Sequence, residues 1–177
     1  MDIYFLRHAS AGQYSPGSND DKRPIDKTGE QQSHDVGRAL AGLDLKFDAI
    51  ISSPLTRAMQ TATIAAAELG HKDKIVADDA LRPEASYEQF ENLLARYAKK
   101  KKAILLVGHN PSMTEFLIQI LAGSDSSEFI DFKKGALAKI ERIDRQPAIL
   151  KWCLTPKVVR AIQQASASSS RPKTVSK

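Results

Sequence analysis

The amino-acid sequence predicts an α/β fold in three layers, α/β/α, with a mostly parallel central sheet and an antiparallel hairpin at one edge. Three short apolar runs carry this prediction: residues 3–6, 49–52 and 103–107. Each run has the length of a buried strand and is too short for a buried helix. The second and third runs lead directly into segments with helical periodicity, as in the repeating units of a parallel sheet.

The first strand is followed by a polar loop, residues 10–27, which is rich in Pro, Gly, Asn and Asp. We expect this loop to lie over the end of the strand and to border a pocket. Thr28, with Gln31 three residues later, predicts a helix that starts with a capping box. Apolar residues at helical spacing give that helix one buried face: Val36, Ala39, Leu40 and Leu43.

The second strand leads into a helix that we expect to begin with Ser53 as its N-cap and Pro54 at its first position. Residues 74–77 then predict a short strand near the edge of the sheet. The next helix begins at Ser86, where Gln89 stands at the position that completes a capping box.

The third strand is followed by a helix over residues 113–122, which Gly123 is expected to end. Residues 136–143 and 148–154 predict two more strands with a short polar connection between them. That spacing is typical of an antiparallel hairpin at the edge of the sheet.

Length and charge predict one domain, residues 1–160, and a disordered C-terminal tail, residues 161–177. A chain of 177 residues is long enough to bury the core of a single domain. The formal net charge is +5, but residues 1–154 hold 21 basic and 21 acidic residues, so the excess comes from the C-terminal segment. Because this segment is also rich in Ser, we expect a solvated tail, with docking to an acidic partner as the alternative.

Composition also disfavours several classes of protein. No apolar run approaches the ~20 residues of a membrane-spanning helix, and the first strand begins too near the N-terminus for a signal peptide. The single cysteine, Cys153, excludes an internal disulfide and fits a reducing compartment. We therefore expect a cytoplasmic monomer without a nucleic-acid or membrane partner, since its basic excess is confined to one terminal segment.

Arginine or histidine follows each of the three strands. Arg7 and His8 follow the first, Arg57 lies in the first turn of the helix after the second, and His109 follows the third. Parallel strands bring their carboxyl ends to one edge, where α/β sheets bind ligands. We therefore expect these side chains to form a phosphoryl site, assisted by the free N–H groups of the helix near Pro54. The alternative is a set of polar strand ends in water.

Three motifs resemble those of the histidine phosphatase superfamily, the phosphoglycerate-mutase-like enzymes: Arg7-His8-Ala9, the run from Ser53 to Ala62, and Gly108-His109-Asn110. The segment RPIDKTG, residues 23–29, is similar to the SixA-type phosphohistidine phosphatases within that superfamily. The resemblance extends over residues 1–156 and implies a phosphoglycerate-mutase-like fold.

The resemblance also implies the roles of the site residues. His8 is expected to attack phosphorus as a neutral imidazole and to form a phosphohistidine that water hydrolyses. Arg7 and Arg57 are expected to hold the phosphoryl oxygens and to depress the pKa of His8, while a backbone carbonyl fixes its tautomer. His109 would donate a further hydrogen bond, and Asn110 beside it belongs to the substrate-binding set. No cofactor and no metal are expected, and the sequence has no acidic cluster or paired ligand spacing.

Arg23 in the polar loop has two alternative roles. It could approach the phosphoryl group, or it could pair with Asp20 or Asp26. The structural pairing is the one we favour.

The proton donor is the main departure from the superfamily pattern. Many members carry Glu at the place where this chain has Pro83, as expected for the SixA-type branch. Glu84 follows one residue later and is the candidate acid, and Asp78 and Asp79 lie nearby.

These features predict a metal-independent phosphatase that acts through His8 on phosphohistidine in a protein, and so in signal transduction. One alternative is a small-molecule phosphomonoesterase that uses Glu84 as its acid. Another is a non-catalytic phosphoryl-binding module, against which the nucleophilic imidazole of His8 argues. The sequence alone identifies neither the physiological substrate nor the acid.

Overall fold

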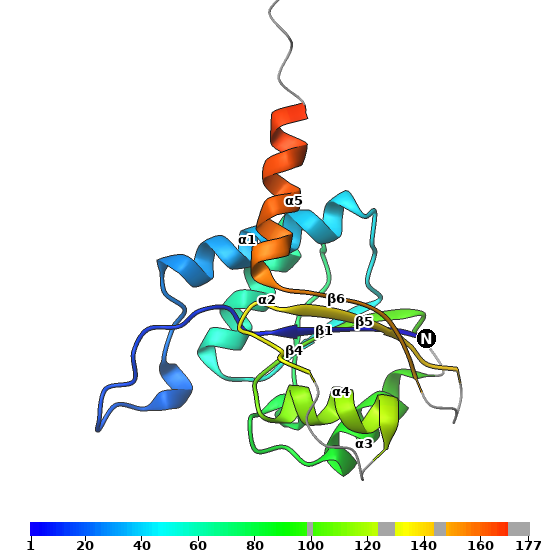
Figure 1. Cartoon of the computed structure of the whole chain (residues 1–177). Coiled ribbons are helices and arrows are strands. Elements are labelled where there is room, and N and C mark those ends of the chain that lie inside the picture. The colour runs from blue at the N-terminus through cyan, green and yellow to red at the C-terminus, as the bar shows by residue number, and fades with distance from the viewer. Residues whose placement is uncertain (99–100, 124–129, 144–147, 170–177) are drawn as a thin grey trace, which may run out of the picture.

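The computed structural model describes residues 1–98, 101–123, 130–143 and 148–169, with side chains as far as residue 165 (Figure 1). Six strands form one sheet between two groups of helices. In chain order the elements are β1 (Asp2–Arg7), a 3-10 turn η1 (Asp20–Lys22), α1 (Lys27–Gly42), β2 (Ala49–Ser52), α2 (Thr56–Glu68), β3 (Val76–Ala77), a second 3-10 turn η2 (Asp79–Leu81), α3 (Tyr87–Ala98), β4 (Ala103–Gly108), α4 (Ser112–Ala122), β5 (Leu137–Glu141), β6 (Ile149–Leu154) and α5 (Pro156–Ser169).

The strand order is β3-β2-β4-β1-β5-β6. Strands β1 to β4 run parallel to one another, and β5 is antiparallel to both of its neighbours, β1 and β6. The β5–β6 hairpin therefore forms one edge of the sheet, and the two-residue strand β3 forms the other. The predicted α/β fold with an antiparallel edge hairpin is confirmed.

Each face of the sheet packs against its own helices, so the central strands are buried on both sides. Ile3 and Phe5 belong to the core shared with α3 and α4, whereas Tyr4 and Leu6 belong to the core shared with α1 and α2. The two helical layers lie on opposite sides of the sheet (Figure 1). Burial on both faces explains why the central strands read as continuous apolar runs rather than as alternating ones.

The capping predictions are correct at one helix and wrong at two. At α3 the box is confirmed, since Ser86 N donates to Gln89 Oε1 at 2.8 Å and Gln89 N donates to Ser86 Oγ at 3.2 Å. At α1 the N-cap is Asp26 instead of Thr28, because the Asp26 carboxylate accepts from Gly29 N at 2.8 Å. A carboxylate is the stronger acceptor for a free helical N–H, so the helix begins at Lys27.

The start of α2 also differs from the prediction. Ser53 N donates to Val107 O at 2.9 Å, so the chain is still extended there and continues the sheet. The helix therefore begins at Thr56, and Leu55 occupies the N-cap position without a side-chain hydrogen bond. The Ser53 hydroxyl instead accepts from Leu55 N at 3.3 Å, within the turn that joins strand and helix.

The prediction of a disordered tail from residue 161 is wrong for its first part. Residues up to Ser169 continue helix α5, which packs on α1 (Figure 1). Val159 is fully buried in the core on that side of the sheet. Val159 precedes residue 161, so its burial holds the first turn of α5 on the core, and the helix continues from there into the segment that was predicted to be disordered. The remainder of the predicted tail, residues 170–177, lies outside the described residues.

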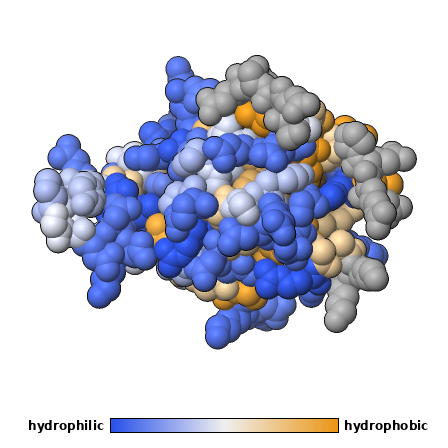
Figure 2. Space-filling model, turned by 90° about the horizontal axis from the view of Figure 1, so that it is seen from below, coloured by the Kyte–Doolittle hydropathy of each residue, from blue (hydrophilic) through white to orange (hydrophobic). Residues whose placement is uncertain are grey.

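The outer face of the α3–α4 layer is largely hydrophilic, with smaller hydrophobic patches among the polar residues (Figure 2). This is expected for amphipathic helices whose apolar side faces the sheet. Within the described part of the chain, no helix has the length and apolar character that a membrane span requires.

Gly29 allows the polar loop to pack on the start of α1, and its replacement by Ala tests this contact. A Cβ at Gly29 would lie 1.9 Å from the backbone oxygen of Ser10, so the chain would have to shift. We expect Gly29→Ala to lower the free energy of unfolding by about 3 kcal/mol, as overpacking against backbone does. Urea denaturation followed by circular dichroism measures this. Gly42→Ala is the matched control, since nothing lies within 4 Å of a Cβ there. Equal stability of the two variants would contradict the close approach.

Candidate active site

Three parallel strands bring the candidate residues to one edge of the sheet. Arg7 ends β1 and is in register with Gly108, which ends β4. The residue after each is a histidine, and the ring centroids of His8 and His109 are 4.9 Å apart. Arg57 is the second residue of α2, which follows the neighbouring strand β2, and the Thr61 hydroxyl links its backbone to Ala9, the residue after His8. The four side chains expected at this edge therefore lie together.

The hydrogen bonding of His8 selects one tautomer of its buried ring. Nδ1 lies 2.7 Å from Ala9 O, and a carbonyl oxygen can only accept, so Nδ1 carries the proton. Nε2 then retains its lone pair. Burial lowers the pKa of His8 to about 3; the bond to Ala9 opposes this shift and the charges of Arg57 and Arg7 add to it. At neutral pH His8 is therefore a neutral imidazole with an unprotonated Nε2.

Thr61 connects the backbone after His8 to helix α2. Its hydroxyl donates to Arg57 O at 2.7 Å and accepts from Ala9 N at 3.1 Å. Ala9 and Thr61 are both fully buried, so the carbonyl that orients His8 is held rigidly. Sequence analysis missed Thr61, because a threonine inside a helical pattern gives no sign of a contact with a distant loop.

The two arginines are each held at one end of the guanidinium group and unpaired at Nε. Arg7 Nη1 donates to Phe132 O at 2.8 Å, and Arg57 Nη1 donates to Asp20 O at 2.9 Å and lies 3.1 Å from Asp20 Oδ2. Among the described residues, the buried Nε atoms of Arg7 and Arg57 have no hydrogen-bond partner. Unpaired buried donors cost free energy. Two of them beside a nucleophile indicate a place where an oxyanion binds.

His109 and Asn110 add further unpaired groups. His109 is 1% exposed, and neither ring nitrogen has a partner within the part of the chain that the structure describes. Burial lowers its pKa to about 2, so the ring is neutral and keeps one N–H donor. Asn110 Nδ2 donates to Phe132 O at 3.2 Å, the same oxygen that accepts from Arg7. Asn110 thus supports the segment that holds Arg7, with its own Oδ1 buried and unpaired among the described atoms.

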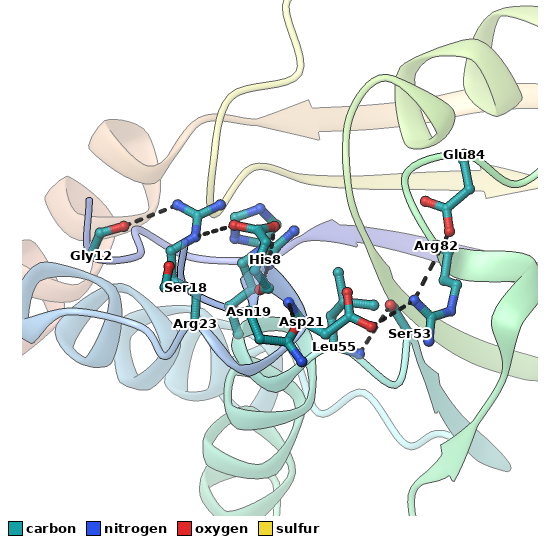
Figure 3. A network of polar contacts seen from close by, with 12 residues as sticks. His8, Gly12, Ser18, Asn19, Asp21, Arg23, Ser53, Leu55, Arg82 and Glu84 are labelled. Carbon is teal, nitrogen blue, oxygen red and sulfur yellow. Dashed lines mark hydrogen bonds and ion pairs between the residues drawn. The ribbon is translucent and has the colours of Figure 1, made fainter. Parts of the chain in front are cut away.

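Arg23 pairs with Asp20, which is one of the two pairings considered from the sequence. Arg23 Nε lies 2.7 Å from Asp20 Oδ1, and Arg23 Nη1 donates to Gly12 O at 3.0 Å (Figure 3). Asp20 also bonds Arg57, so Arg23 reaches the site through this shared carboxylate. Partial burial would raise the pKa of Asp20, but its bonds to the two arginines prevail and lower it. Asp20 is therefore ionised and positions Arg57.

Glu84, Asp78 and Asp79 each lie beside an arginine, either Arg82 or Arg96. The Glu84 side chain is 69% exposed and lies 4.0 Å from Arg82 Nη1 (Figure 3). Asp79 lies 2.6 Å from Arg82 Nε, and Asp78 lies 2.5 Å from Arg96 Nη2. Within the described part of the chain, none of these three carboxylates forms a hydrogen bond or an ion pair with Arg7, His8, Arg57 or His109.

Arg82 is a cation near the site that sequence analysis missed. Its charge contributes to the lowered pKa of His109, and its Nη1 lies 3.2 Å from Asp21 Oδ2 in the polar loop. Ser112 Oγ donates to Arg82 O at 2.9 Å, which ties the residue to the start of α4. Its position in the connection that follows β3 was an available signal, because that connection leaves the same edge of the sheet.

The groups around His8 suit an anion. The guanidinium groups of Arg7 and Arg57 can only donate, and neutral His109 offers one N–H. Among residues 1–98, 101–123, 130–143 and 148–169, no group of three or more His, Cys, Asp or Glu side chains is placed to hold a metal ion.

Comparisons with known proteins agree with this geometry. The family model described as Histidine phosphatase superfamily (branch 1) matches residues 3–101. An uncharacterized protein of Picosynechococcus sp. is 34% identical over 139 residues, which are 77% of this chain and 82% of the relative.

Two solved structures share the fold. The protein histidine phosphatase SixA complexed with tungstate has a TM-score of 0.80 at 20% identity, covering 89% of this chain and 98% of that one. The putative phosphohistidine phosphatase SixA from Agrobacterium tumefaciens has a TM-score of 0.72 at 27% identity, with coverage of 88% and 98%. Because the family model matches more than half of its length, the chain belongs to the histidine phosphatase superfamily.

Proposed function

We propose that this chain is a phosphohistidine phosphatase that acts on proteins, with His8 as the nucleophile. Membership of the superfamily supports a phosphatase in general. The finer proposal depends on one observation: neutral, buried His8 lies among unpaired cationic donors, while Asp78 and Asp79 pair with arginines and Glu84 is exposed.

The first step is attack by His8 Nε2 on the phosphorus of the substrate. A bond forms between Nε2 and phosphorus as the bond to the leaving nitrogen breaks. The proton on Nδ1, held by Ala9 O, lets the imidazole take up positive charge as the bond forms. Arg7 and Arg57 would direct their free Nε donors at the phosphoryl oxygens, and His109 would donate a third bond.

The leaving group decides whether the enzyme needs an acid. A phosphate ester leaves as an alkoxide, and protonation of that oxygen accelerates the reaction typically ~10²–10⁴-fold. A phosphorylated imidazole can take a proton from water on its second ring nitrogen and then leave as neutral imidazole. Asp20 is ionised between two arginines, and Glu84 is exposed, so this site suits the second kind of substrate. Water then attacks the phosphorus of phospho-His8 and releases inorganic phosphate.

Replacement of the nucleophile provides the first test. We expect His8→Ala to reduce kcat to below about a hundredth of wild type and to abolish the phosphoenzyme, because no other group replaces a lost nucleophile. Phosphate release and trapping with a radiolabelled substrate measure both effects. His34→Ala is the matched control, since His34 pairs with Glu68 at 2.6 Å, outside the residues assigned to the site. Substantial activity in His8→Ala would refute the assignment.

The pKa values of the two histidines predict how stability depends on pH. Folding lowers the pKa from 6.5 to about 3 for His8 and to about 2 for His109. At pH values between 6.5 and about 3, the unfolded chain therefore binds more protons than the folded chain. The free energy of unfolding should therefore fall as the pH falls from about 6.5 toward 3. Urea denaturation at pH values across this range measures the slope. The double variant His8→Asn with His109→Asn should give a shallower slope, and an unchanged slope would contradict the shifts.

The role of Glu84 separates the proposed substrate from a phosphate ester. We expect Glu84→Gln to change hydrolysis of protein phosphohistidine by less than about twofold, because neutral imidazole leaves without an enzymic acid. Glu88→Gln, at an exposed position four residues later in α3, is the matched control. Phosphate release from a phosphohistidine protein and from alkyl phosphates measures the preference. A severe loss in Glu84→Gln, together with faster cleavage of alkyl phosphates, would favour the phosphomonoesterase alternative.

A further inference from the structure

A second binding surface lies beside the candidate active site. A cavity of about 800 Å³ opens between the start of α1, the segment before β5 and the start of α5. We call it the basic cleft, after the five cationic side chains that line it: Arg7, Lys133, Lys134, Lys157 and Arg160. Arg7 belongs to both the cleft and the candidate active site, so the two are continuous.

Gly135 fixes the walls of the basic cleft relative to the nucleophile. Its N–H is 3.1 Å from both Arg7 O and His8 O, which ties this segment to the end of β1. A Cβ at this position would lie 3.3 Å from Pro156 Cγ and 3.4 Å from Gln32 Oε1, so α5 and α1 both close around it. The cleft is therefore anchored to His8 through the backbone.

The cleft has unneutralised positive charge. Asp131 lines it and pairs with Lys133 at 2.8 Å, and Arg160 lies 3.5 Å from Asp35. Within the described part of the chain, Lys134 and Lys157 have no salt bridge, and both side chains are exposed. Lys134 directly precedes Gly135, whose N–H lies 3.1 Å from His8 O, so the segment that carries this lysine lies next to the nucleophile.

The chemistry of the lining indicates the class of ligand. Among the described residues, no aromatic, Leu, Ile, Val or Met side chain lines the cavity, so it offers no stacking surface for nucleic-acid bases, and its apolar surface comes from side-chain stems and methyl groups. Apart from Asp131, the remaining lining groups are hydroxyl, amide and proline side chains. Exposed amines spread over an open surface suit several carboxylates that project from a partner chain.

We propose that the basic cleft binds acidic side chains of the protein substrate next to its phosphorylated residue. The proposal rests on the proposed function for the phosphorylated substrate, but its charge preference can be measured without turnover. With the phosphoryl group between Arg7 and Arg57, the flanking chain would extend over Arg7 toward Lys134 and Lys157. The charge of the cleft would then determine which protein substrates bind well. The chemistry at His8 does not require this charge.

Fluorescence anisotropy with labelled peptides tests the preference. One peptide carries a non-hydrolysable phosphohistidine analogue flanked by glutamates, and the other carries the same analogue flanked by glutamines. We expect wild type to bind the acidic peptide about tenfold more tightly, because several exposed ion pairs each add a small factor. The preference should disappear at about 0.5 M NaCl, where such charges are screened. Equal affinity for the two peptides at low salt would overturn the proposal.

Charge reversal in the cleft identifies the surface responsible. Lys157→Glu should lower the preference for the acidic peptide about three- to fivefold. The variant should fold, because Lys157 is exposed and an acidic residue in the first turn of α5 favours the helix. Lys72→Glu is the matched control, since it makes the same change at an exposed site outside the cleft. Identical affinities in the two variants would overturn the proposal, as would more effective displacement of the peptide by an RNA oligonucleotide of equal charge.

A separate assay of dephosphorylation distinguishes the two proposals. This assay uses the same two peptides with phosphohistidine in place of the analogue. If neither of them is dephosphorylated but the Lys157-dependent binding preference persists, the basic cleft is supported and the proposed function fails. If both peptides are dephosphorylated with equal kcat/KM and bind equally, the proposed function is supported and the cleft proposal fails.

Discussion

The in-register parallel pairing of β1 with β4 is the constraint on which this site depends. Because Arg7 is opposite Gly108, the residues that follow the two strands, His8 and His109, lie beside each other. A Cβ at Gly108 would lie 2.7 Å from Met113 Sδ and 3.0 Å from the backbone oxygen of Leu81, so a larger residue would force these neighbours to shift. A shift of the register by one residue would reverse the face of each side chain and separate the two histidines.

Burial gives this edge of the sheet its chemical character. It removes positive charge from His8 and His109, leaves two arginine Nε atoms unpaired, and so prepares neutral imidazoles beside strong donors. Asp20 pairs with Arg57 at Nη1, and Arg57 Nε has no partner among the described residues. A bound phosphoryl group would satisfy the unpaired donors, so the cost of these groups in the free protein favours anion binding.

The sequence by itself determined the fold class and the position of the four central side chains. Short apolar runs and helical periodicity are local signals, and parallel strands necessarily gather their carboxyl ends at one edge. That rule predicts that Arg7, His8, Arg57 and His109 lie together. The capping box at the start of α3 is equally local, since both of its hydrogen bonds join residues three apart, and it formed as predicted.

Only the tertiary structure decided features that depend on contacts between distant segments. The N-cap of α1 and the late start of α2 follow from a carboxylate and a sheet hydrogen bond that local patterns do not rank. The helical state of α5 depends on burial of Val159 against the core, although its composition favours a solvated tail. The pairing of Asp20 with Arg57 spans 37 residues. Glu84 is exposed and lies 4.0 Å from Arg82. Packing and long-range electrostatic interactions determine these features. Both arise only when segments that are far apart in the sequence come together in the folded chain.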